Sequence, residues 1–256
     1  MKRLTIAFML IAGSLAISAQ TTEPEEKLKK FETDTVEGWK TGGTITLNLS
    51  QVSLINWAAG GQNSISVNGL FSTFAVYHKD KKLWENFLDI GYGTIKQGEN
   101  ANWWKTDDKI DFTSKYGQKI SKQWYYAALL NLKTQVAKGY DYPNDSMVIS
   151  NLLAPGYVLG AIGMDYQSDF NFTAFLAPIT LKTTIVRDQE LANAGAFGVE
   201  PAVYDTLTGN VTIKGRQGRT ELGGYIRLGY KLEPMQNITL QTKIDFFSNY
   251  LNKPQT

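Results

Sequence analysis

The residues of this chain that could do chemistry are carboxylates and amines that alternate with apolar residues along β-patterned segments. Asp111 and Lys115, for example, alternate with Phe112 and Tyr116, so the two pairs are expected on opposite faces of one strand. Acids and amines on a shared face either pair with one another or line a polar interior. The candidates for such an interior are Glu85, Asp89, Lys109, Asp111, Lys115, Lys133, Asp165, Arg227, Lys243 and Asp245. Both signs are present in similar numbers, so the face favours anions only marginally.

Catalytic and metal-binding arrangements are scarce. The single histidine, His78, stands beside Lys79 and Asp80 in a polar string, which indicates a solvated turn residue. The acidic pairs Asp107-Asp108 and Asp141 with Asp145 fall in predicted external loops and would bind a divalent cation only weakly, because the EF-hand spacing is absent. We therefore predict no catalytic group, no metal and no cofactor, and a protein that is not an enzyme.

Composition excludes several other classes. The 256 residues carry a formal net charge of +2 with scattered Lys and Arg, so nothing indicates a nucleic-acid partner. The chain has no cysteine, which excludes disulfides, thiolate metal sites and a lipid-modified N-terminal cysteine.

The N-terminus has the pattern of an export signal. Lys2 and Arg3 precede an apolar run over residues 4–17, and Ser18-Ala19 supplies small residues at a cleavage site. We predict a signal peptide over 1–19. A membrane-anchoring helix is the alternative, but the run is shorter than the roughly 20 residues that a span needs. Residues 20–38 are rich in Glu, Lys and Thr and are predicted to form a flexible periplasmic leader.

Period-two alternation predicts nine strands in one domain over residues 39–256. In the first segment, Ile45, Leu47 and Leu49 alternate with polar residues, and Pro178 indicates a bulge or a slip in the alternation of a later one. The nine predicted segments are approximately 43–53, 64–77, 83–96, 109–120, 124–137, 156–166, 170–186, 222–231 and 238–246.

The connections between these segments alternate in length. Short polar links over 78–82, 121–123, 167–169 and 233–237 alternate with long links over 97–108, 138–155 and 187–219. Short periplasmic turns and long external loops are typical of outer-membrane β-barrels. The chain is thus predicted to be an all-β, antiparallel, up-and-down transmembrane β-barrel.

Tryptophan placement favours a membrane barrel over a soluble one, since alternation alone suits both. Trp84 and Trp124 follow short links, whereas Trp57, Trp103 and Trp104 lie in or beside long ones. That distribution is typical of aromatic girdles at the two membrane–water interfaces, although indoles also cap soluble cores.

The opening of the domain resembles a known family. Gly38-Trp39-Lys40-Thr41-Gly42-Gly43 is followed by Leu47-Asn48-Leu49-Ser50-Gln51 and then by Asn56-Trp57-Ala58-Ala59-Gly60-Gly61-Gln62-Asn63-Ser64. These residues resemble a family of Bacteroidota envelope proteins recorded only as a domain of unknown function. The resemblance runs from Trp39 to the end of the chain. It implies an outer-membrane β-barrel and no site residue.

Strand parity and function complete the expectations. Bacterial single-chain barrels have an even number of strands, so a ninth strand that ends outside predicts an incomplete C-terminus and a complete barrel of 10 or 12. The predicted function is a non-enzymatic small-solute channel or envelope scaffold in the outer membrane. Its partners would be outer-membrane lipids and the barrel-assembly machinery, with an unknown external solute or ligand. The alternatives are an outer-membrane enzyme acting on lipid or peptide at the external rim, and a soluble periplasmic or secreted β-barrel that binds an apolar ligand.

Overall fold

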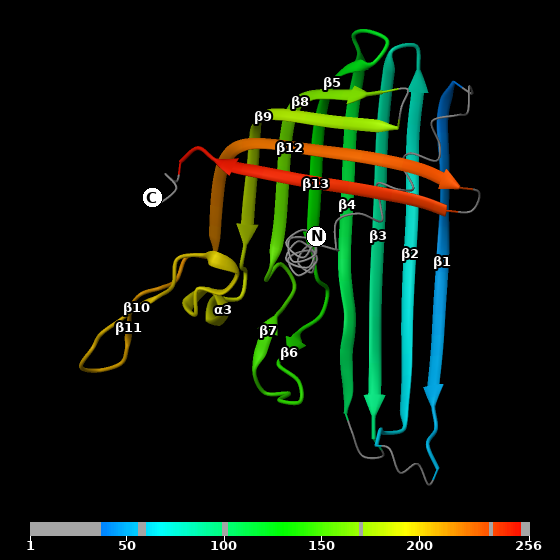
Figure 1. Cartoon of the computed structure of the whole chain (residues 1–256). Coiled ribbons are helices and arrows are strands. Elements are labelled where there is room, and N and C mark those ends of the chain that lie inside the picture. Colours follow the sequence, from blue (N-terminus) through cyan, green and yellow to red (C-terminus); the bar gives the residue numbers. More distant parts are fainter. Residues whose placement is uncertain (1–36, 56–59, 99–101, 169–170, 236–237, 252–256) are drawn as a thin grey trace, which may run out of the picture. The chain divides into compact units, whose positions relative to one another are not determined.

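The computed structural model describes residues 37–55, 60–98, 102–168, 171–235 and 238–251 (Figure 1). All of them belong to one compact unit over residues 36–256. The predicted signal peptide, the leader up to residue 36 and Trp57 lie outside the described residues.

One antiparallel sheet dominates the described chain. It holds nine strands in the order β1-β2-β3-β4-β5-β8-β9-β12-β13 (Figure 1). Their bounds are β1 Gly38–Val52, β2 Ser64–Lys79, β3 Lys82–Gln97, β4 Trp103–Lys119, β5 Trp124–Thr134, β8 Gly156–Gln167, β9 Phe172–Ile185, β12 Gly218–Met235 and β13 Ile238–Asn249.

The all-β class and the up-and-down strand order are confirmed, because every sheet strand pairs antiparallel with the next sheet strand along the chain. The sheet is not closed into a barrel. Within the described residues β1 and β13 are its two edge strands.

The predicted start of β4 at residue 109 was wrong. The strand begins at Trp103, and a register shift explains the error: Gly93 pairs with Asp107, but the next residue, Thr94, pairs with Lys105. Thr106 is therefore an extra residue that reverses the alternation on its N-terminal side. The link that the sequence predicted over 97–108 is consequently one of the shorter ones, at residues 98–102.

The bulge predicted at Pro178 is confirmed. Ile162 pairs with Ile179 and Met164 with Leu176, so β9 has one more residue than β8 across this interval. The pairing with β12 shifts at the same place. Proline has no N–H to donate to a ladder, so a bulge is where a sheet accommodates it.

The registers sort the side chains of the nine strands onto two faces, since paired residues share a face and consecutive residues alternate. We call the face that includes Glu85, Lys115 and Leu129 the charged face, because these residues are aligned across β3, β4 and β5. The opposite face, which includes Trp84, is the apolar face.

The two longest connections are ordered, and together we call them the cap. The β5–β8 connection contains β6 Gly139–Tyr140 and β7 Val148–Ser150. The β9–β12 connection contains the helix α3 Gln189–Asn193, the turn η1 Ala196–Gly198, and the hairpin of β10 Val203–Tyr204 with β11 Val211–Ile213 (Figure 1). A separate apolar cluster joins the two connections. Its buried members are Ala154, Val186, Leu191, Ala192 and Val199.

Gly163 offers a test of the β8–β9 pairing next to the bulge. A Cβ at this position would overlap the backbone carbonyl oxygen of Leu176 and lie 2.6 Å from Ala177 Cα, and these backbone atoms cannot yield without moving β9. We expect Gly163→Ala to destabilise the fold by about 1–3 kcal/mol, measured by denaturant unfolding. The matched control is Gly160→Ala on the same strand, where a Cβ meets nothing within 4 Å. Equal stability of the two variants would contradict the pairing.

Candidate functional site

Ion pairs on the charged face connect different strands of the sheet. Lys115 Nζ on β4 lies 2.6 Å from Asp165 Oδ2 on β8, passing over the intervening β5. Lys133 Nζ lies 3.1 Å from Asp111 Oδ2, and Asn131 donates its amide to the other oxygen of Asp111 at 2.7 Å. Each acid is buried and therefore lies where an unpaired charge would be costly.

A second set of pairs lies on β9, β12 and β13. Arg227 binds Asp245 through Nε at 2.7 Å and through a second nitrogen at 3.2 Å, the bidentate geometry that suits a guanidinium and a carboxylate. Tyr225 donates its hydroxyl to the same Asp245 at 3.0 Å. Glu221 accepts from Arg219 at 2.6 Å and lies 4.0 Å from Lys182.

The registers place all ten predicted interior residues on the charged face. Six of them form the pairs of Lys115 with Asp165, Lys133 with Asp111, and Arg227 with Asp245. The remaining four are Glu85, Asp89, Lys109 and Lys243, which the registers align with Lys115, Asp111, Gly91 and Gly229 respectively. Whether this face lines an interior remains a prediction.

The apolar face has charged side chains only near strand ends. Among the strand residues whose side chains the structure describes, these exceptions are Lys79, Lys82, Lys96, Lys105 and Asp108. Between them the face is mainly aliphatic and aromatic, with uncharged polar residues such as Asn86 and Ser114, and its most exposed part is at mid-sheet, where the paired Ile162 and Ile179 are 62% and 61% exposed.

Aromatic residues form a row along the apolar face at the short-turn end of the strands. Trp39 lies 5.3 Å from Tyr77 and 5.6 Å from Trp84, measured between ring centroids. On the next strands Trp124 lies 4.9 Å from Tyr166. The members of this aromatic row are Trp39, Tyr77, Trp84, Tyr116, Trp124, Tyr126, Tyr166, Phe172 and Tyr230.

The predicted interface tryptophans divide between the two ends of the strands. Trp84 and Trp124 belong to the aromatic row, whereas Trp103 and Trp104 begin β4 at the opposite end. Trp103 is half-exposed, and Trp104 stacks on Tyr142 of the cap with centroids 5.4 Å apart. Their position at a membrane interface stays a prediction.

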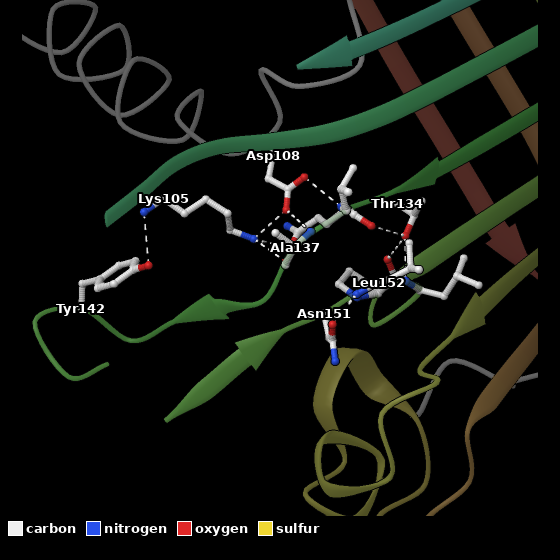
Figure 2. Close-up of polar contacts among 11 residues, drawn as sticks. Lys105, Asp108, Thr134, Ala137, Tyr142, Asn151 and Leu152 are labelled. Carbon is white, nitrogen blue, oxygen red and sulfur yellow. Dashed lines mark hydrogen bonds and ion pairs between the residues drawn. The ribbon is translucent and has the colours of Figure 1, made fainter. Parts of the chain in front are cut away.

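A polar clamp holds the cap to β4 (Figure 2). The Asp108 carboxylate accepts the backbone N–H groups of Val136 at 2.8 Å and Ala137 at 2.9 Å, and it lies 2.8 Å from Lys105 Nζ. Lys105 Nζ in turn donates to the Ala137 carbonyl at 2.9 Å. The structure corrects the predicted loop placement of Asp107-Asp108: both residues lie within β4, and the Asp108 carboxylate takes part in the clamp.

The cap also contains a depression of about 400 Å³ lined by Asn151, Leu152, Arg187, Asp188, Gln189 and Glu190. Asp188 is the N-cap of α3 and accepts the backbone N–H groups of Glu190 and Leu191. Partial burial acts to raise the pKa of Asp188, but the hydrogen bonds from Asn151, Leu191 and Glu190 outweigh it and lower the pKa. Asp188 is thus a structural acid, and the depression lacks a paired nucleophile and base.

The described residues supply little else for catalysis. They contain no group of three or more His, Cys, Asp or Glu able to hold a metal ion. Every buried side-chain nitrogen or oxygen among them has a hydrogen-bond partner. None of their helices is long and apolar enough to cross a membrane.

Comparison with protein-family models finds a match to part of the chain. Residues 49–140 match a family model described as "Protein of unknown function (DUF3078)", a stretch that runs from β1 to β6. The predicted resemblance to a family of unknown function is thus confirmed for this part of the chain. Neither the curated proteins nor the solved structures that were compared contain a match.

The Lys115–Asp165 pair yields a stability prediction. Lys115→Met leaves Asp165 buried without its cation and should cost roughly 3–5 kcal/mol. Adding Asp165→Asn should recover part of that loss, because the stranded charge is removed. The measurement is denaturant unfolding of the single and double variants.

An exposed ion pair serves as the control. Arg216 lies 2.8 Å from Glu200 with both side chains about 70% exposed, so Arg216→Met should change stability by less than about 1 kcal/mol. A Lys115→Met effect as small as this one would show that the charged face is solvated.

Proposed function

We propose that this chain is an integral outer-membrane β-barrel protein without enzymatic activity, acting as a small-solute channel or as an envelope scaffold. The observation that supports it most is the inverted distribution of polarity. Buried Asp165, Asp111 and Glu85 lie on one face of the sheet, while the other face exposes aliphatic residues such as Ile162 and Ile179. A soluble sheet has the opposite arrangement, with its charges in water and its aliphatic residues buried.

The extent of the apolar face argues for lipid as its solvent. Large contiguous apolar patches are rare on soluble monomers and mark a membrane or a partner. This one covers all nine strands. Its large exposed members at mid-strand include Leu47, Phe71, Leu130, Ile162, Leu176, Ile179, Leu181, Leu222, Ile226, Ile244 and Phe246.

The height of this face suits a bilayer. On β3 the apolar stretch of this face begins at Trp84 and ends at Tyr92, which is nine residues when both are counted. A tilted membrane-crossing strand needs roughly 9–11 residues. Aromatic residues at the limits of an apolar band are typical of outer-membrane barrels.

Polar side chains on the apolar face of β3 and β4 form hydrogen bonds within the protein, as polar groups in a hydrocarbon environment must. Trp84 Nε1 donates to Ser114 Oγ at 3.0 Å, and Ser114 donates to Asn86 Oδ1 at 2.7 Å. Asn86 then donates its amide to the Ala75 carbonyl at 3.2 Å.

The proposal has further parts. The tryptophan motif at residues 38–64 resembles Bacteroidota envelope proteins, so we infer an outer-membrane location reached through the predicted signal peptide. Outer-membrane lipids and the barrel-assembly machinery are the expected partners. The ten predicted interior residues on the charged face are the expected lining of the interior.

Heat-modifiable migration tests the proposal directly. The chain refolded in detergent should run faster on a gel when unheated than when boiled, and it should float with lipid vesicles in a density gradient. A single band and a protein that stays in the aqueous fraction would contradict membrane insertion.

A charge placed on the apolar face discriminates a membrane protein from a soluble one. Ile162→Lys should destabilise the inserted protein by about 2–4 kcal/mol, because a lysine would face hydrocarbon, and the shift is measurable by urea unfolding from vesicles. In a soluble protein the same exposed substitution would be nearly neutral.

Leu207→Lys is the matched control. Leu207 lies at the tip of the β10–β11 hairpin, outside the sheet, and is 94% exposed. Asp205 holds this tip by accepting the N–H groups of Leu207 and Thr208. The control should retain the stability of the unmodified chain, and equal losses at both positions would overturn the assignment of the apolar face to lipid.

A further inference from the structure

The charged face carries a buried apolar layer in addition to its ion pairs. The layer consists of Ala127, Leu129, Ala161, Phe175, Ala177 and Tyr225, with Leu159 and Phe247 packed against it. It extends over five adjacent strands, from β5 to β13. We call it the inner layer.

Neighbouring residues on the same strands show how strongly the two faces differ. Leu129, Phe175 and Tyr225 are 8%, 5% and 6% exposed. The residues that follow the first two, Leu130 and Leu176, and the one after Tyr225, Ile226, point to the apolar face and are 40%, 38% and 42% exposed. At these positions β5, β9 and β12 each have a buried side chain on the charged face and an exposed one on the apolar face. A face open to a water-filled pore would leave its aromatic rings accessible.

Cations cover the aromatic rings of the inner layer. Lys115 Nζ lies 6.0 Å from the centroid of the Phe175 ring, and Arg227 Cζ lies 5.4 Å from the centroid of the Tyr225 ring. Lys182 Nζ lies 5.4 Å from the Phe247 centroid. Such contacts attract a cation to the face of the ring.

The same cations are held by acids. Asp165 binds Lys115 at 2.6 Å, Asp245 binds Arg227 at 2.7 Å, and Glu221 lies 4.0 Å from Lys182. Each cation thus bridges an aromatic ring and a carboxylate. A permeating ion would need unpaired charges along its path, but these cations and carboxylates are already paired with one another.

Small residues allow this layer to pack tightly. Ala161 and Ala177 are 2% exposed and Thr180 is fully buried, its hydroxyl donating to the Ala177 carbonyl at 3.2 Å. These residues surround the bulge at Pro178, where β9 gains a residue. Neighbouring atoms therefore leave these three residues with almost no accessible surface.

We propose that the inner layer closes the charged face between β5 and β13 to solutes, so that the protein supports the membrane as a scaffold and does not conduct. This inference rests on the proposed function, since only a membrane-inserted protein has an interior to close.

Planar-bilayer recording of the refolded full chain in potassium chloride tests the closure. The unmodified chain should give no discrete conductance steps. Phe175→Ala combined with Tyr225→Ala removes the two central rings and should produce repeatable steps. The matched control, Leu176→Ala with Ile226→Ala, changes the exposed neighbours on the same strands and should stay silent. Steps from the unmodified chain, or silence from the ring-deleted variant that has inserted, would overturn the proposal.

A labelling experiment avoids the risk that the ring-deleted variant does not fold. Because the chain has no cysteine, Ala161→Cys introduces a single thiol into the inner layer with little change in volume. A membrane-impermeant maleimide should not label it in vesicles, whereas Leu207→Cys at the exposed hairpin tip should be labelled fully. Equal labelling at the two positions would show that solutes reach the inner layer.

The two proposals fail in distinguishable ways. A chain that neither floats with vesicles nor shows heat-modifiable migration contradicts membrane insertion and therefore the proposed function. A chain that inserts and conducts contradicts only the closure of the inner layer.

Discussion

The two contrasting faces of this sheet depend on side-chain alternation staying in phase across nine paired strands. A slip of one residue in any register would exchange the two faces of that strand and place charges among exposed aliphatic residues. The bulge at Pro178 shows how the phase is kept. Leu176 and Ile179 differ by three positions, yet both lie on the apolar face because the bulge absorbs the extra residue. Thr106 acts in the same way on β4.

Regular alternation places the acids on one face and the aliphatic residues on the other, and each face then has its own energetic requirement. Asp111 and Asp165 are desolvated on the charged face and would be strongly unfavourable there without Lys133 and Lys115. The cations also lie over aromatic rings of the inner layer, so packing and electrostatics support each other. The apolar face has no such internal partner. Under the proposed function this exposed aliphatic surface contacts lipid, in agreement with the aromatic residues at its limits.

The cap adds a second, smaller structural unit at the long-connection end of the strands. Asp108 and Lys105 hold one residue of the β5–β8 connection, Ala137, through its backbone N–H and its backbone carbonyl. Hydrogen bonds and the buried Val186 then connect that segment to the β9–β12 connection. Long loops of this kind usually carry function or are poorly ordered. Here they share a buried apolar cluster, and the second connection carries the β10–β11 hairpin.

The sequence alone determined the approximate strand segments, the up-and-down order and the shared face of the ten predicted interior residues, because alternation and turn chemistry are local properties. It also located the Pro178 bulge, since proline cannot donate to a ladder. It misplaced the start of β4, because the bulge at Thr106 has no such marker, and it missed α3 and the cap core, whose apolar residues are few and irregularly spaced. Only the tertiary structure decided which charges pair. Lys115 meets Asp165 fifty residues away across an intervening strand, and the Asp108 carboxylate binds the backbone of residues 136 and 137. Such contacts depend on non-neighbouring strands and connections coming together, and no local pattern encodes that distance.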